Sequence, residues 1–154
     1  MTIDEQYMDL ALEEAHTAYG IGEIPIGAVI TYENSVIATA HNLREAIPCA
    51  TAHAELLAIQ EACQKLHRWR LTGCTLYVTV EPCPMCAGAI VNSRLTRLVY
   101  GSSDYKAGAV ESLFNIVQNN SLNHQAIVTT GVRGDQCRQI MKDFFRERRN
   151  QINK

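Results

Sequence analysis

The sequence has no apolar run that approaches membrane-spanning length, and its first residues lack the basic and then apolar pattern of a secretory signal. It is also short, with 154 residues, of which 47% are apolar and 19% charged. This composition is that of an ordinary globular domain large enough to bury its own core. We therefore expect a cytoplasmic protein without a membrane segment, folded as one domain over residues 1–154.

An excess of positive charge is missing as well. The chain carries 14 Lys and Arg against 16 Asp and Glu, which gives a net charge of −2 and does not by itself indicate a nucleic-acid partner. The distribution is uneven, because residues 1–30 contain no Lys or Arg. The last predicted helix and its approach are instead rich in them: Arg133, Arg138, Lys142, Arg146, Arg148 and Arg149. This asymmetry permits a local contact with an anionic partner.

Six cysteines are present, and in a cytosolic chain of this size they favour metal ligands and buried thiols over disulfides. Cys83 and Cys86 have the spacing of a ligand pair. The other four are scattered and are expected to be small buried hydrophobic side chains. They are Cys49, Cys63, Cys74 and Cys137.

Hydrophobic periodicity predicts alternating helices and strands. A first helix runs through Met8 and ends at Gly20. Strands are predicted at 24–31, 35–41, 74–80, 95–100 and 126–130, and further helices at 53–66, 83–92, 112–117 and from 135 onward. This order predicts a three-layer α/β/α fold, in which a central five-stranded mixed sheet starts with an antiparallel hairpin and carries helices on both faces.

Two short motifs carry the chemistry: Thr51-Ala52-His53-Ala54-Glu55 and Glu81-Pro82-Cys83-Pro84-Met85-Cys86. The second joins a predicted strand to a predicted helix, so both thiols fall on a first helical turn, where free N–H groups and the helix dipole stabilise thiolates. His53 also lies at the start of a predicted helix. One imidazole and two thiolates make three zinc ligands and leave one tetrahedral position open, which is the arrangement of a catalytic zinc.

Glu55 lies two residues beyond His53. Zinc lowers the pKa of a bound water from ~15.7 toward roughly 7. A neighbouring carboxylate can take the proton of that water and return it to a substrate nitrogen. The two motifs together predict zinc-dependent attack of water on an amidine-like carbon, with loss of ammonia.

Two other interpretations of the cysteine pair remain open. A closed structural zinc site would need a fourth ligand, for which Cys49 and Cys74 are the candidates. A thioredoxin-like redox pair also joins a strand to a helix through C-x-x-C, but it leaves the His53 motif unexplained.

The motifs are common to cytidine, deoxycytidylate, cytosine, guanine and tRNA adenosine deaminases. Nearly the whole chain resembles the bacterial tRNA-specific adenosine deaminases, and the matching segments after Cys86 are the most specific. The segments are 22–29, 40–42, 51–55, 69–71, 76–89, 93–94, 99–101, 104–106, 123–124 and 144–146.

That resemblance implies a cytidine deaminase-like fold and hydrolysis of adenosine to inosine at the wobble position of an arginine tRNA. It also implies a homodimer with one Zn²⁺ per subunit. Glu55 is then the catalytic residue and His53, Cys83 and Cys86 the ligands. Further residues are implied to bind substrate: Ile26, Asn42 and Ala54 in the adenine pocket, and Asp104, Lys106, Phe145 and Arg149 near the anticodon loop.

The accessory residues also have structural explanations. Asn42 could simply close the loop after the second strand. Phe145 continues the apolar spacing of Cys137, Ile140, Met141 and Phe144 and could be buried. The basic residues Arg138, Lys142, Arg146 and Arg149 share one helix face, which could be merely solvated.

Two segments depart from the family pattern: Cys49-Ala50, and Val110-Glu111, where Glu111 adds a negative charge near the expected RNA loop. Both bear on loop geometry and on tRNA affinity rather than on the zinc chemistry. The alternative activity is deamination of free guanine or cytosine. An alternative of another class is an inactive zinc module that binds RNA or a partner subunit.

Overall fold

The computed structural model describes residues 1–152. Its elements follow the order α1 (Ile3–Gly20), β1 (Gly27–Tyr32), β2 (Ser35–His41), α2 (Ala54–Leu66), β3 (Cys74–Val80), α3 (Pro84–Asn92), β4 (Arg97–Ser102), β5 (Ile127–Thr130) and α4 (Gly134–Ile152). All five strands form one sheet in the order β2-β1-β3-β4-β5. The β1–β2 and β1–β3 pairs are antiparallel, whereas β3–β4 and β4–β5 are parallel. The predicted mixed sheet and its opening hairpin are confirmed.

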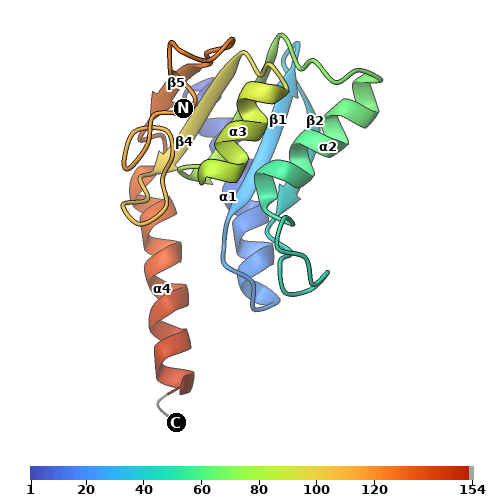
Figure 1. Cartoon of the computed structure of the whole chain (residues 1–154). Helices are drawn as coiled ribbons and strands as arrows, with labels where there is room; N and C mark the ends of the chain where they lie inside the picture. Colours follow the sequence, from blue (N-terminus) through green and yellow to red (C-terminus); the bar gives the residue numbers. More distant parts are fainter. Residues whose placement is uncertain (153–154) are drawn as a thin grey trace.

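Helices cover both faces of this sheet, as expected from the alternation of elements (Figure 1). Successive strand side chains point to opposite faces. Ala28 and Ile30 therefore pack with the helices α2 and α3, while Val29 between them packs with α1 and α4. The sheet thus separates two hydrophobic clusters, which gives the predicted three layers.

Gly27 marks a close approach between β1 and α1. A Cβ atom added at this position would lie 1.9 Å from the carbonyl oxygen of Ala11. The helix backbone can pack this closely only against a residue without a side chain. This close contact holds α1 against the start of β1.

One predicted element is wrong. Residues 112–117 do not form a helix but belong to a turn-rich loop between β4 and β5. The backbone N–H groups of Val110, Glu111 and Ser112 donate to the buried carboxylate of Glu81, at 3.1, 2.8 and 3.0 Å. The Glu81 carboxylate thus organises this part of the chain as a loop.

The longest helices in the described part of the chain are α1 and α4. The second half of α4 extends beyond the edge of the sheet (Figure 1). No helix within residues 1–152 combines the length and the apolar composition required to cross a membrane.

Candidate active site

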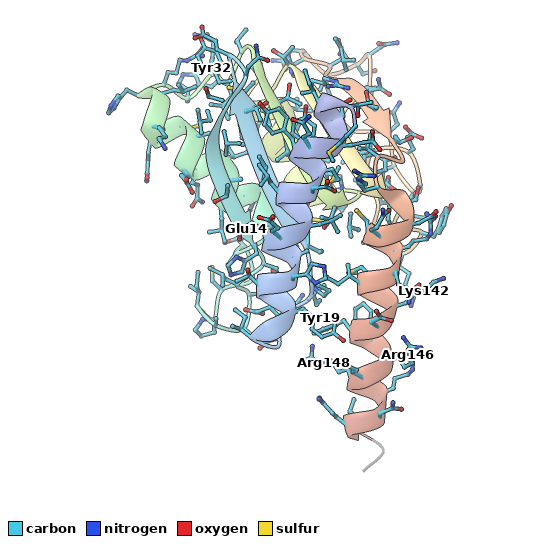
Figure 2. The ribbon with its side chains drawn as sticks, turned by 180° about the vertical axis from the view of Figure 1, so that it is seen from behind. Glu14, Tyr19, Tyr32, Lys142, Arg146 and Arg148 are labelled. Carbon is cyan, nitrogen blue, oxygen red and sulfur yellow. The ribbon has the colours of Figure 1, made fainter. Side chains whose placement is uncertain are left out.

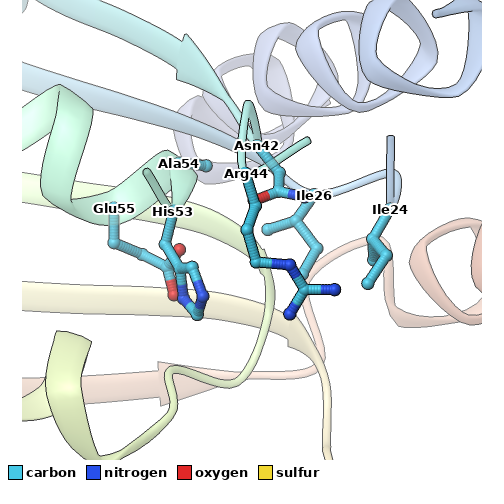
Figure 3. Close-up of a pocket in the computed structure, with 7 residues that line it drawn as sticks. All are labelled: Ile24, Ile26, Asn42, Arg44, His53, Ala54 and Glu55. Carbon is cyan, nitrogen blue, oxygen red and sulfur yellow. The ribbon is translucent and has the colours of Figure 1, made fainter. Parts of the chain in front are cut away.

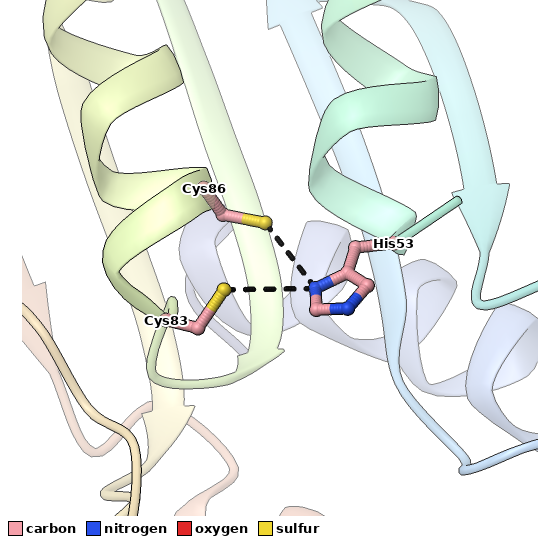
Figure 4. A group of neighbouring side chains, drawn as sticks. All are labelled: His53, Cys83 and Cys86. Atoms are coloured by element: carbon pink, nitrogen blue, oxygen red, sulfur yellow. Dashed lines mark hydrogen bonds between the residues drawn. The ribbon is translucent and has the colours of Figure 1, made fainter. Parts of the chain in front are cut away.

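His53, Cys83 and Cys86 come together where α2 and α3 begin (Figure 4). His53 is the residue before α2 and Cys83 the residue before α3, and Cys86 lies in the first turn of α3. The Nδ1 atom of His53 is 3.6 Å from Sγ of Cys83 and 3.5 Å from Sγ of Cys86. Sulfur and nitrogen ligands of one tetrahedral zinc are expected roughly 3.6 Å apart, given bond lengths of about 2.3 and 2.0–2.1 Å. The donor set therefore fits a zinc ion in both chemistry and spacing.

The three side chains are electrostatically coupled. Hydrogen bonds from Cys86 and His53 lower the pKa of the Cys83 thiol to about 4. The same Cys83 contact, together with burial, raises the pKa of Cys86 well above its usual range. The Cys83 contact also raises the pKa of His53. Metal ligation requires both cysteines as thiolates, so a bound metal would displace any proton that remains on this pair.

Glu55 lies in the first turn of α2, and its side chain is 4% exposed. Burial removes water from the carboxylate and raises the pKa of Glu55 to about 7. Such a carboxyl group can both accept and release a proton near neutral pH. The structure therefore brings a suitable proton carrier beside the metal-ligating group.

A small pocket opens beside His53 and Glu55 (Figure 3). Its lining includes the three residues expected to bind the base, namely Ile26, Asn42 and Ala54. The N–H group of Asn42 donates to the carbonyl of Ile26 at 3.1 Å, which joins the two walls of the pocket. An apolar wall such as Ile26 beside a polar group such as Asn42 suits a small planar base.

Two residues that line the pocket, Ile24 and Arg44, are not among the site residues predicted from the sequence. The position of Arg44, two residues after Asn42 in the same loop, is the sequence signal that points to it. A single charged residue in a polar loop is otherwise typical of a solvated surface.

The other cysteines stay outside the metal-ligating group. Within residues 1–152, the only group of three or more candidate ligands close enough to share a metal is His53, Cys83 and Cys86. Cys74 and Cys137 are buried, as expected, and Cys63 is half-buried. Cys49 is exposed, so its predicted burial is wrong: it lies in the loop between β2 and α2, where its thiol pairs with the Thr51 hydroxyl at 3.2 Å. The structure offers no support for a fourth cysteine ligand.

The residues expected near the anticodon loop lie on other elements. Asp104 and Lys106 belong to the loop after β4, where the Asp104 carboxylate accepts the N–H groups of Lys106 and Ala107 at 3.0 and 3.1 Å. Asp104 therefore shapes its own loop. Phe145 on α4 is 40% exposed, so it does not belong to the buried stripe of that helix; its ring packs edge-on against Phe144. Contact of these residues with RNA stays a prediction.

The basic face of α4 is partly neutralised. Arg138 pairs with Asp135, and Arg146 with Asp143. Lys142 and Arg149 make no ion pair with any residue of the described range 1–152. Figure 2 shows Lys142 and Arg146 on the outer side of α4, away from Tyr19, whose ring packs against Phe144. Only part of this face is free to meet an anion.

The departure at Val110-Glu111 is accommodated by the backbone. Both residues contribute their N–H groups to the Glu81 carboxylate, a contact that does not depend on their side chains. Gly108 in the same loop is less replaceable, since an added Cβ would lie 2.4 Å from Cδ of Glu81. The loop beside Cys83 is thus fixed by Glu81 and Gly108.

Comparison with known proteins gives a consistent result. The sequence profile of the MafB19-like deaminases matches residues 3–149. A tRNA-specific adenosine deaminase of Bacillus subtilis (strain 168) is 52% identical over 149 residues, which are 97% of this chain and 92% of that protein.

Solved structures agree. One from a study of A-to-I editing by tRNA:A34 deaminases at the wobble position has a TM-score of 0.85 and 42% identity, over 88% of this chain and 98% of that one. A guanine deaminase from Nitrosomonas europaea reaches a TM-score of 0.76 at 27% identity, over 91% and 83% of the two chains. With relatives this similar over nearly their full length, the chain belongs to the tRNA-specific adenosine deaminase family.

Proposed function

We propose that the protein hydrolyses adenosine to inosine at the wobble position of a tRNA, with an arginine tRNA as the expected substrate, and releases ammonia. The observation that carries this proposal is one pocket lined by Asn42, Glu55 and His53, in which His53 also belongs to the metal-ligating group with Cys83 and Cys86. The sequence relatives support adenosine in tRNA as the substrate.

His53, Cys83 and Cys86 would hold one zinc ion in each subunit of a homodimer in the cytoplasm. When bound, zinc supplies Lewis-acid activation of a water molecule. Imidazole and thiolate ligands suit this metal.

The remaining steps belong to the chain itself. Glu55 takes a proton from the attacking water as the new C–O bond forms at C6 of adenine, and delivers it to N1. A second proton passes through the same carboxyl group to the leaving amine. The C–N bond then breaks, so that adenosine and water give inosine and ammonia.

The pocket walls orient the base. Asn42 can hydrogen-bond to a purine edge, and Ile26 can pack against its face. A base inside a folded RNA must leave its stack to enter such a pocket, and an anticodon loop lowers that cost because its bases are already unpaired. Phe145, with its exposed ring, could stack on a neighbouring loop base.

The second candidate is deamination of a free base, which the structural similarity to a guanine deaminase favours. Incubating the protein with anticodon stem-loop RNA that carries adenosine or guanosine at the wobble position, and separately with free guanine and cytosine, distinguishes the two. We expect inosine only in the adenosine RNA. Ammonia released from a free base without inosine in RNA would refute the proposal, and no product from any substrate would favour an inactive zinc module.

A further inference from the structure

Among the described residues 1–152, Arg44 is the only Lys or Arg side chain that lines the pocket, and it belongs neither to the metal-ligating group nor to the residues expected to bind the base. It follows Asn42 by two residues in the loop between β2 and α2. In Figure 3 its guanidinium extends on the same side of the pocket as the ring of His53, between that ring and Ile24. No carboxylate within the described residues 1–152 forms an ion pair with it. Its five N–H donors are therefore available to a ligand.

The backbone around Arg44 is fixed by a buried carboxylate. Glu23 is 1% exposed. It accepts the N–H group of Glu45 at 3.0 and 3.1 Å and that of Ala46 at 2.9 Å. The carbonyl of Arg44 in turn accepts the N–H group of Cys49 at 2.9 Å. Two sets of hydrogen bonds thus fix the backbone here. Glu23 holds the two residues that follow Arg44, and Cys49 holds the carbonyl of Arg44 itself.

Glu23 has no salt-bridge partner in the part of the chain that the structure describes, so these backbone N–H groups are what compensates its burial. It also adjoins Ile24, which is another residue of the pocket lining. A carboxylate so placed ties the segment before β1 to the loop that carries Arg44. Its effect is to keep a cationic side chain at the pocket.

The ligand of Arg44 follows from its chemistry. Guanidinium groups bind phosphate through paired N–H donors, and they do so best when the side chain is held in place. A nucleotide flipped into the pocket brings the phosphates on either side of it to the pocket entrance, whereas a free base brings none.

We propose that Arg44 binds a backbone phosphate next to the flipped adenosine, and that Glu23 is the positioning residue that holds Arg44 for this contact. The inference rests on the proposed function, because it requires an RNA substrate. It assigns to Arg44 the preference for a nucleotide within RNA over a free base.

The test is the salt dependence of kcat/KM on anticodon stem-loop RNA, between about 50 and 200 mM salt. Loss of one phosphate contact on a single strand lowers the slope of log(kcat/KM) against log[salt] by ~0.7 in magnitude. For Arg44→Gln we expect that change, together with a KM raised about tenfold and a kcat nearly unchanged. Arg44→Lys should keep the wild-type slope. Arg68→Gln is the matched control: it removes the same charge beyond the far end of α2 and should leave the slope unaltered.

A double-mutant comparison tests the role of Glu23. If Glu23 acts through Arg44, Glu23→Gln raises KM in the wild-type background but adds nothing to Arg44→Gln. If Glu23→Gln fails to fold, the comparison uses Glu23→Asp instead, in which the side chain that carries the carboxylate is one methylene shorter. If the increases in KM caused by Glu23→Gln and by Arg44→Gln multiply in full in the double variant, Glu23 does not act through Arg44 and the positioning role is overturned. An unchanged salt slope in Arg44→Gln would overturn the phosphate contact. Absence of inosine with the wild-type protein would instead refute the proposed function, so the two failures are distinguishable.

Discussion

The pocket region and the outer half of α4 differ in how firmly their functional side chains are held. At the pocket, Glu55 and Asn42 are at most 5% exposed and lie on or beside regular elements. On α4, the side chains of Phe145 and Arg149 are exposed, and the neighbouring Arg146 is already paired with Asp143. Effects of substitution should therefore decrease with the exposure of the side chain, because a buried polar group has no water to replace a lost partner.

The largest effect is expected at Glu55. Glu55→Gln removes the proton carrier without changing the size of the side chain, so kcat should fall about 10²–10⁴-fold. Inosine formation in RNA under single-turnover conditions measures it. Metal content and the unfolding midpoint serve as controls and should match the wild type. Activity within threefold of the wild type would remove Glu55 from the mechanism.

The next effect is one of stability, at Glu81. Burial raises the pKa of this carboxyl, but the N–H donors of Glu111, Ser112 and Asp104 outweigh it and hold the pKa below its usual value. Glu81→Gln should reduce the free energy of unfolding by about 2–4 kcal/mol, since an amide cannot accept all of these hydrogen bonds. Denaturant titration of the metal-loaded protein measures it.

The matched control for Glu81 is Glu111→Gln. The Glu111 side chain is exposed, and its backbone donor is retained in the variant. We expect a change within about 0.5 kcal/mol. Equal destabilisation by the two variants would show that loop composition, and not the buried carboxylate, organises the segment.

A smaller, pH-dependent effect is expected at Asp4. About a quarter of its side chain is exposed, so it is intermediate between the buried residues of the pocket and the exposed residues of α4. Its hydrogen bond with Arg97, at 2.6 Å, lowers the pKa of Asp4 below 3.8 in the folded protein. The ionised form therefore stabilises the fold above pH ~4, and this contribution is lost as the pH falls through the lowered value. Asp4→Asn should cost about 1 kcal/mol at neutral pH.

The measurement is the difference in unfolding free energy between wild type and Asp4→Asn from pH 6 downward. That difference should shrink below pH ~4. Asp135→Asn on the exposed start of α4 is the control and should show a smaller difference throughout. A difference that grows toward low pH would contradict the assignment.

The smallest effect is expected on α4. Arg149 makes no ion pair within residues 1–152, whereas Arg146 pairs with Asp143. If this face meets RNA, Arg149→Gln should raise KM a few-fold and reduce the salt slope by ~0.7, and Arg146→Gln should do less. Kinetics on stem-loop RNA at several salt concentrations compare them. Identical behaviour of the two variants would indicate a merely solvated face.

The sequence predicts features that local patterns determine better than features that depend on contacts between distant segments. The spacing of His53, Glu55, Cys83 and Cys86 follows from where helices begin, so their meeting was predictable from local patterns. Apolar, β-branched runs likewise predicted the strands β1 and β3, and the alternation of helices and strands along the chain predicted the mixed sheet. Residues 112–117 do not form the predicted helix, because the N–H groups at the start of this loop, those of Glu111 and Ser112, bond to Glu81, some thirty residues earlier.

Arg44 and Phe145 illustrate the remaining failures. Arg44 reaches the pocket through a loop shape set by Glu23, which no periodic pattern encodes. Phe145 fits the apolar spacing of α4, yet it is 40% exposed, whereas its neighbour Phe144 is buried against Tyr19 of α1. Both depend on contacts between distant segments.

A metal site with three protein ligands and one open position makes a definite prediction for the metal content of each chain. Zinc should be measured in the wild type and in the Ser variants of Cys49, Cys74, Cys83 and Cys86. We predict about one zinc per chain in the wild type and in the Cys49 and Cys74 variants, and strong loss in the Cys83 and Cys86 variants. Loss of zinc from the Cys49 or Cys74 variant to the same extent would show instead that a fourth cysteine closes the site.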